Sequence, residues 1–225
     1  MLRSETASEP RWHAALATVA ALLLYVTLPP KVIVGPFWLM PLLVLLILVP
    51  LLILAPRRDE LEHPWQRFAS VASIAVLNLF NLCTIGLFFF YELSGAHRRE
   101  FNGGGLLEIA VQLWLTNIIV FALWFWEVDG GGPGARTQTD FMSNPERADF
   151  LFPQMALTGE VSRLLRWKPQ FIDYLFLAFT NATAFSPTDT FALSPMAKVL
   201  MMAQAIISLV TVAIVVGRAV NILSG

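Results

Sequence analysis

The stretch WKPQFIDYLFLAFTNATAFSPTD, residues 167–189, contains an apolar segment that is too short to cross a membrane as a helix. The segment runs from Phe171 to Phe185, whereas a membrane-spanning helix needs about 20 residues. Its polar side chains gather at its end: Thr180, Asn181 and Thr183. In a half-membrane helix, this end would direct the negative pole of the helix dipole and several oxygens toward the bilayer interior. The stretch therefore predicts a re-entrant helix with an irregular return segment; an ordinary short span that ends in a Ser-Pro turn is the alternative.

The composition of the whole chain is that of an integral membrane protein. Of its 225 residues, 56% are hydrophobic and 14% are charged, and the mean hydropathy is +0.65. A soluble fold could not hide so much apolar surface behind so few charges, so the sequence excludes a soluble enzyme. Fifteen Lys and Arg stand against sixteen Asp and Glu without a basic arm, which argues against a nucleic-acid partner. We expect a multi-pass protein of the plasma membrane.

Five further apolar runs predict membrane-spanning helices and an all-α fold. They are Trp12 to Pro29, Val32 to Ala55, Arg67 to Glu92, Leu106 to Trp126 and Ser194 to Leu223. A cleavable signal peptide is the alternative for the first run, but no small-residue cleavage site follows it. Trp124 and Trp126 are typical of an aromatic belt at the membrane surface. Ser194 and Pro195 predict the N-cap and the first position of the last helix.

The chain divides into three parts. Residues 1–128 form a four-helix transmembrane region, residues 129–168 an extramembrane loop, and residues 169–225 the short helix with the last span. The loop opens with GGGPG at 130–134 and holds much of the remaining charge. Its segment DFLFPQM, residues 149–155, is too apolar for a free linker, so we expect it to lie on the headgroups or pack against the helices.

Signatures of the common enzyme and metal sites are missing from the chain. The three histidines, His13, His63 and His97, lie in loops or at span ends without an i,i+4 pair, and Cys83 is the single cysteine. No HExxH, GxSxG, GxGxxG or P-loop motif occurs, so we expect no metal and no cofactor. A membrane-embedded enzyme that acts on lipid would need two boundary carboxylates, such as Glu108 and Asp173, to converge on one cavity.

Polar residues within the predicted spans each need a partner or a water-lined cavity. On the third and fourth runs, hydrogen bonds between helices are the simplest interpretation for five of them: Asn78, Asn81, Gln112, Thr116 and Asn117. On the last run, Gln204, Ser208, Thr211, Val215 and Arg218 repeat at intervals of four and three and fall along one stripe. We expect this stripe to face neighbouring helices or water.

The segment from Asp173 to Leu223 resembles potassium-channel-like pore modules, in which an aspartate-led aromatic pore helix and a threonine-rich filter precede the inner helix. The family filter Thr-Val-Gly-Tyr-Gly-Asp is similar to TAFSPTD, residues 183–189, at Thr183 and Asp189, but both glycines are absent and one residue is added. Glycines give such filters the backbone angles that turn carbonyls toward the ion. TNATAFSPTD, residues 180–189, is also similar to a signature of bacterial membrane proteins.

The resemblance implies that the re-entrant loop lies outside the cell and the C-terminus inside. The distribution of positive charge indicates the opposite orientation, because cytoplasmic loops carry the excess of Lys and Arg. With the N-terminus inside, only four of the fifteen fall on the outer side: Lys31, Arg98, Arg99 and Arg218. The sequence leaves the orientation open.

The resemblance implies a tetrameric channel with a non-canonical filter that conducts small ions passively. The residues implied for the pore and filter are Thr180, Asn181, Thr183, Ala184, Phe185, Ser186 and Asp189. Along the stripe of the last helix, Gln204, Ser208 and Thr211 would line the cavity, and Arg218 would form a charged ring that leaves the sign of the ion open. A non-conducting membrane scaffold or accessory subunit, with the threonine-rich loop as a packed plug, is the alternative.

Overall fold

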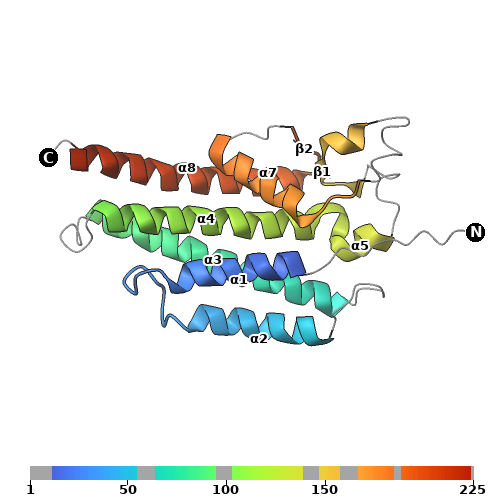
Figure 1. Ribbon diagram of the computed structural model, residues 1–225, viewed down its shortest axis with the longest axis horizontal. Coiled ribbons are helices and arrows are strands. Elements are labelled where there is room, and N and C mark those ends of the chain that lie inside the picture. The colour runs from blue at the N-terminus through green and yellow to red at the C-terminus, as the bar shows by residue number, and fades with distance from the viewer. Residues whose placement is uncertain are drawn as a thin grey trace, which may run out of the picture.

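The computed structural model describes residues 12–54, 64–94, 103–138, 147–157, 167–184 and 189–223 of the chain. Helices make up most of these residues (Figure 1). The α-helices are α1 (Trp12–Val26), α2 (Leu39–Leu54), α3 (Pro64–Ser94), α4 (Gly103–Val128), α5 (Pro133–Gln138), α7 (Phe171–Ala184) and α8 (Pro195–Leu223). The remaining elements are the 3-10 helices η1 (Asp129–Gly131) and η4 (Pro153–Ala156) and the strands β1 (Phe150–Leu151) and β2 (Phe191–Ala192).

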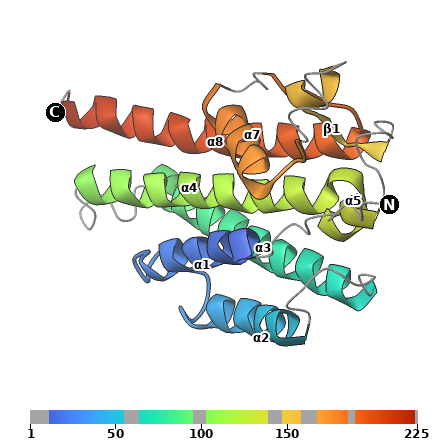
Figure 2. The same ribbon diagram turned by 45° about the vertical axis from the view of Figure 1, so that its right-hand side comes forward.

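Helix α4 is the centre of the bundle. It packs against α1, α3, α7 and α8, whereas α2 packs on α3 at the edge. Figures 1 and 2 show the long helices side by side along the long axis of the molecule, with α7 and α8 on one side of α4 and α1, α2 and α3 on the other. Most of the fully buried side chains belong to α4 or to its neighbours, among them Leu77, Leu113, Phe121 and Phe125.

Three helices in the described part of the chain are long and apolar enough to cross a membrane. Their spans are Trp65–Tyr91, Gly104–Gly131 and Pro195–Gly217. Helices α1 and α2 are also apolar, but they contain 15 and 16 residues. The bundle leaves many large apolar side chains on its surface, such as Phe68, Phe90 and Ile206, which suits contact with lipid rather than water. The prediction of a helical membrane protein is confirmed at this level.

The second apolar run forms its helix later than we predicted. The sequence placed its start at Val32, whereas α2 begins at Leu39 and residues 27–38 form turns. Gly35 has a φ of +74°, a conformation that interrupts a right-handed helix, and Pro36 follows it without an N–H group to donate. These two residues explain the delay.

The start of α8 is the predicted one. Helix α8 begins at Pro195, and Oγ of Ser194 accepts a hydrogen bond from the backbone N–H of Ala197 (3.1 Å). Ser194 is therefore an N-cap, and Pro195 occupies the first position, where a missing N–H costs nothing.

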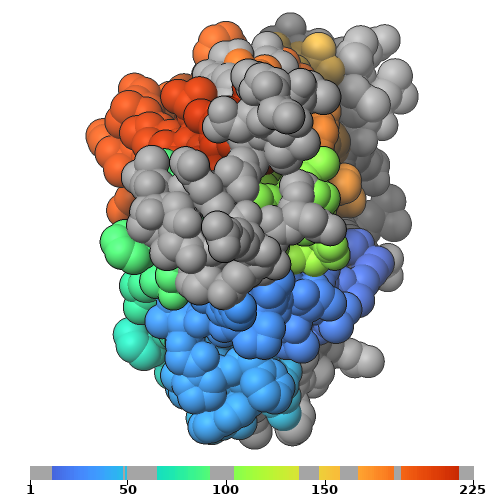
Figure 3. Space-filling model, turned by 90° about the vertical axis from the view of Figure 1, so that its left-hand side faces the viewer, coloured from blue at the N-terminus to red at the C-terminus, as the bar shows by residue number. Residues whose placement is uncertain are grey.

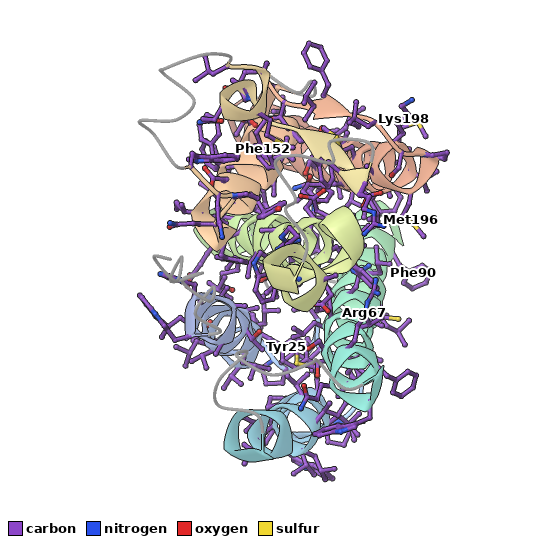
Figure 4. All side chains as sticks on the ribbon, turned by 90° about the vertical axis from the view of Figure 1, so that its right-hand side faces the viewer. Tyr25, Arg67, Phe90, Phe152, Met196 and Lys198 are labelled. Carbon is purple, nitrogen blue, oxygen red and sulfur yellow. The ribbon has the colours of Figure 1, made fainter. Side chains whose placement is uncertain are left out.

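The segment 149–155 packs against the helices, which is one of the two positions that we expected from the sequence. Phe150 and Phe152 are buried, and the ring of Phe150 lies 5.1 Å from that of Phe125 on α4. Trp126 is 4% exposed and packs edge-on against Phe171 at 6.1 Å, so protein covers this side chain. Residues 149–155, which we call the cap, therefore pack over the aromatic end of α4. Figure 4 shows Phe152 within the cap and Phe90 pointing outward from α3.

Candidate functional site

Helix α7 is half as long as the spans beside it. Its 14 residues extend about 21 Å at 1.5 Å per residue, against the ~30 Å of a hydrocarbon core. The helix begins where the sequence predicted it, because Oδ2 of Asp173 accepts a hydrogen bond from the backbone N–H of Gln170 (2.7 Å). A carboxylate in the first turn satisfies a free donor and favours the positive end of the helix dipole.

Both ends of the α7 segment are fixed at the same end of the bundle. Strand β1, before α7, pairs antiparallel with β2, after it, with Phe150 opposite Ala192 and Leu151 opposite Phe191. The backbone N–H of Leu193 donates to the carbonyl oxygen of Asp149 (2.8 Å) and extends this pairing. Figure 1 shows α7 leaving the strands and reaching about halfway along α8, with β2 back beside β1. The chain therefore enters and leaves at one end.

The last turns of α7 are joined to α8 by a reciprocal pair of amides. Nδ2 of Asn181 donates to Oε1 of Gln204 (2.8 Å) and to the carbonyl oxygen of Met201 (3.0 Å). Nε2 of Gln204 donates in return to the carbonyl oxygen of Ala178 (2.8 Å). Asn181 is 3% exposed and Gln204 is fully buried, so these bonds form in an environment without competing water. They set how far α7 reaches along α8.

The polar contacts between long helices lie near the middle of the spans. Nδ2 of Asn117 on α4 donates to Oγ of Ser208 on α8 (3.0 Å), and both residues are fully buried. Asn117 is at the centre of the span Gly104–Gly131, and Ser208 is two residues past that of Pro195–Gly217. Gln204 lies one helical turn before Ser208, so the end of α7 reaches this middle level too.

The predicted filter residues differ in their surroundings. Thr180 is 8% exposed, and its hydroxyl donates within α7 to the carbonyl oxygens of Phe176 and Leu177. Thr183 and Ala184 are exposed at the end of α7, where the Thr183 hydroxyl donates to the carbonyl oxygen of Phe179 (2.9 Å). Phe185 and Ser186 lie outside the described residues.

Asp189 is exposed where the described chain resumes, and its Oδ1 accepts a hydrogen bond from the hydroxyl of Thr190 (3.2 Å).

The predicted cavity-lining residues face the interior of a single chain. Gln204, Ser208 and Thr211 are 0%, 0% and 2% exposed. The Thr211 hydroxyl donates to the carbonyl oxygen of Ile207 in its own helix (2.8 Å). Arg218 lies further along α8. The outer face of α8 carries apolar side chains instead, including Met202, Ile206 and Leu209. In this chain the polar stripe is an interhelical contact, and its role in a water-filled cavity stays a prediction.

A buried charged cluster that the sequence analysis missed fixes the start of α7. Asp129, which is 0% exposed, accepts hydrogen bonds at Oδ1 from the backbone N–H groups of Asp149 (2.7 Å) and Phe150 (3.2 Å). Its Oδ2 accepts one from the hydroxyl of Tyr174 (2.5 Å). One carboxylate thereby connects the end of α4 to β1 and α7. An acidic residue at the end of a span, directly before three glycines, was the available signal.

Arg136 on α5 completes this cluster. Its Nη1 donates to the carbonyl oxygens of Trp126 (2.8 Å) and Asp129 (2.5 Å), and its guanidinium lies 5.2 Å from the centre of the Tyr174 ring. A cation at the C-terminal end of α4 satisfies free carbonyls and complements the helix dipole. The turn that brings Arg136 back to α4 needs glycine: φ is +97° at Gly132, and a Cβ there would lie 3.1 Å from the carbonyl oxygen of Glu127.

The two carboxylates that a lipid enzyme would need do not converge. Asp173 is next to Tyr174, which bonds to Asp129 at the end of α4. Glu108 lies about 20 residues earlier on α4, which corresponds to about 30 Å along the helix.

Comparison of the chain with protein-family models, with curated proteins and with solved structures finds no match.

Proposed function

We propose that the protein conducts small ions passively across the plasma membrane through a pore built around the end of α7. In this proposal α7 and its return segment form a re-entrant hairpin, and α1, α2, α3, α4 and α8 cross the bilayer. The filter region comprises Thr180, Asn181, Thr183, Ala184, Phe185, Ser186 and Asp189. Among these, Thr183 and Ala184 are exposed and available to an ion, whereas Asn181 acts by holding α7 against α8.

One observation carries the proposal: α7 stops at the middle of the spans and its chain returns to the end from which it came. A helix that ends at half depth leaves backbone carbonyls without helical partners there. In lipid such groups are tolerated only beside protein or a water-filled path. A half-membrane helix with this geometry is the arrangement from which known ion filters are built.

The electrostatics of the hairpin favour cations. The C-terminal end of a helix carries about half a negative charge, and α7 presents this end at the middle level. Residues 171–197 contain Asp173 and Asp189 and no Lys or Arg. We therefore propose a small cation as the transported ion.

A homotetramer would place four hairpins around one axis. From Val199 to Val216, the side of α8 that points away from α4 is apolar, and Figure 3 shows this helix at the surface of the molecule. Ile172, Phe176 and Phe179 on α7 are exposed as well. Such a surface suits contact with either lipid or a neighbouring copy of the chain. In a tetramer, the neighbouring subunits would cover it.

A non-conducting scaffold or accessory subunit is the second candidate. It is favoured by the closed hydrogen bonding of Asn181, Gln204 and Ser208, which fills the middle of the α4–α7–α8 interface with satisfied polar groups. In that case the return segment would be a sealed plug.

Ion flux in liposomes tests the proposal. Purified protein would be reconstituted with a potassium, sodium or chloride gradient, and its oligomeric state in nanodiscs would be measured by native mass spectrometry. We expect a tetramer that passes a cation and not chloride. A tetramer that passes no ion, or a monomer, would refute the proposed pore. The scaffold or accessory subunit would then be the remaining candidate function.

Two substitutions connect any flux to the hairpin. We expect Thr183→Val and Asp189→Asn to change the conductance or the cation preference several-fold, because they remove an oxygen and a charge from the filter region. Thr18→Val is the matched control, since Thr18 is buried on α1 and its hydroxyl donates only to the carbonyl oxygen of Ala14 among the described contacts. Equal flux in all three variants would place the conducting path elsewhere.

A further inference from the structure

Helix α3 carries buried polar atoms that make no hydrogen bond within the described structure. They are Oδ1 of Asn78, both Oδ1 and Nδ2 of Asn81, and the hydroxyl of Thr84. Asn81 is 2% exposed and Thr84 is 0% exposed. A polar group that is buried without a partner costs about 1–3 kcal/mol, so native proteins seldom keep several together unless something binds them.

Asn78 and Asn81 lie on the face of α3 that is turned to the end of α4. Nη1 of Arg67 lies 3.9 Å from the position a Cβ would take at Gly131, just past the end of α4. Asn78 and Asn81 follow Arg67 by 11 and 14 residues, about three and four helical turns, and so share its face. Figure 4 shows Arg67 at this end of the bundle, where α3 lies next to α4 and α5.

Asn117 lies at the level of Asn81, because each is 14 residues from the contact between Arg67 and Gly131. Asn117 precedes Gly131 by 14 residues, and the two helices run in opposite directions and pack together. Oδ1 of Asn117 is buried without a hydrogen-bond partner, while its Nδ2 donates to Ser208. The unpaired atoms therefore come from two helices, and Asn78, Asn81 and Asn117 lie within a few residues of the middle of their spans.

The chemistry of this group is that of neutral oxygen ligands. Four oxygens stand against two donors, Nδ2 of Asn81 and the hydroxyl proton of Thr84, and exchanging the two ends of the Asn81 amide changes nothing because neither is bonded. Residues 68–90 of α3 and 109–126 of α4 contain no Asp, Glu, Lys, Arg or His. A divalent ion would lack carboxylates and an anion would lack a positive charge, whereas carbonyl and hydroxyl oxygens suit a monovalent alkali cation.

We infer that the interior between α3 and α4 binds a monovalent alkali cation at the level of Asn81 and Asn117. The negative end of α7 lies one turn of α8 from Ser208, the partner of Asn117, and adds to the attraction. The site lies within one chain and does not depend on conduction by the α7 hairpin. Water bound by the same oxygens is the rival occupant.

Thermal unfolding of the full chain in detergent tests the site without measuring flux. Tryptophan fluorescence would report the midpoint in lithium, sodium, potassium and choline chloride at one ionic strength. We expect one alkali cation to raise the midpoint above that in choline by about 3–6 °C and to saturate, as a ligand of the folded state does. Equal midpoints in the four salts would show that water fills the site and would overturn the inference.

A variant and a control on the same helix locate the effect. Asn81→Leu is expected to lose the cation-dependent rise, and Ser73→Ala, which removes a buried hydroxyl that already donates to the carbonyl oxygen of Ala69, is expected to keep it. If Asn81→Leu kept the rise, the site would be elsewhere. If Asn81→Leu does not fold, Asn81→Asp provides a second test. Its carboxylate should lower the half-saturating concentration of the alkali cation about tenfold and add a response to calcium. An unchanged concentration in this variant would also overturn the inference. A protein that binds the cation but passes no ion would refute only the proposed function.

Discussion

Helices α7 and α3 both carry asparagines into the interior of the bundle, but only one of them closes its hydrogen bonds. Nδ2 of Asn181 on α7 donates to Gln204 and to the carbonyl oxygen of Met201, and Gln204 donates in return to the carbonyl oxygen of Ala178. Asn81 on α3 is buried to the same degree and is bonded at neither end of its amide. Polarity and burial alone therefore do not identify a binding site. The distinction lies in whether the buried atoms already have partners.

The largest expected loss of stability comes from the charged cluster of Asp129, Arg136 and Tyr174 at the start of α7. Asp129→Ala removes a carboxylate that accepts three hydrogen bonds and that interacts electrostatically with the buried Arg136. Losing one partner of a buried charged pair costs about 3–5 kcal/mol. We expect the unfolding free energy in mixed micelles to fall by this amount. Tyr174→Phe, which removes one of the three bonds, is the graded control and should cost less than half as much.

The next effect compares the two asparagines directly. Asn181→Leu leaves the amide of Gln204 buried with fewer partners, and we expect a loss of about 1–2 kcal/mol. In choline chloride, Asn81→Leu should be neutral or stabilising, because it replaces unpaired polar atoms with apolar ones. Parallel unfolding curves of the two variants give the comparison. If both lost stability equally, the amide of Asn81 would have a partner after all.

The smallest effect is at the boundary between the two regions. Ser208→Ala removes the acceptor of Asn117 and adds one more unpaired group at the middle level. Single interhelical hydrogen bonds in membranes contribute about 0.6 kcal/mol, so we expect a loss of this size. Ser73→Ala on α3 is the control, because the Ser73 hydroxyl donates to the carbonyl oxygen of Ala69 within its own helix. Equal losses in the two variants would show that Ser208 contributes nothing as a partner of Asn117.

Local signals in the sequence predicted where the helices begin better than they predicted which residues contact each other. The apolar segment from Phe171 and the Ser194-Pro195 pair marked the starts of α7 and α8, because helix starts are decided within a few residues. The start of α2 was wrong because the apolar run continues through Gly35, whose positive φ no hydropathy pattern reveals. Asn117 and Ser208, 91 residues apart, meet only because of how α4 and α8 are rotated. Asp129 and Tyr174, 45 residues apart, depend in the same way on the fold of the cap.

The pairing of β1 with β2 also constrains the order in which the chain is assembled during synthesis. Helix α7 is made before β2, Met201 and Gln204, so its contacts with them cannot form as it emerges. The contacts of its last turns with α8 therefore form only after α8 has been synthesised, whereas the bond between Asp129 and Tyr174 can hold the start of α7 before then.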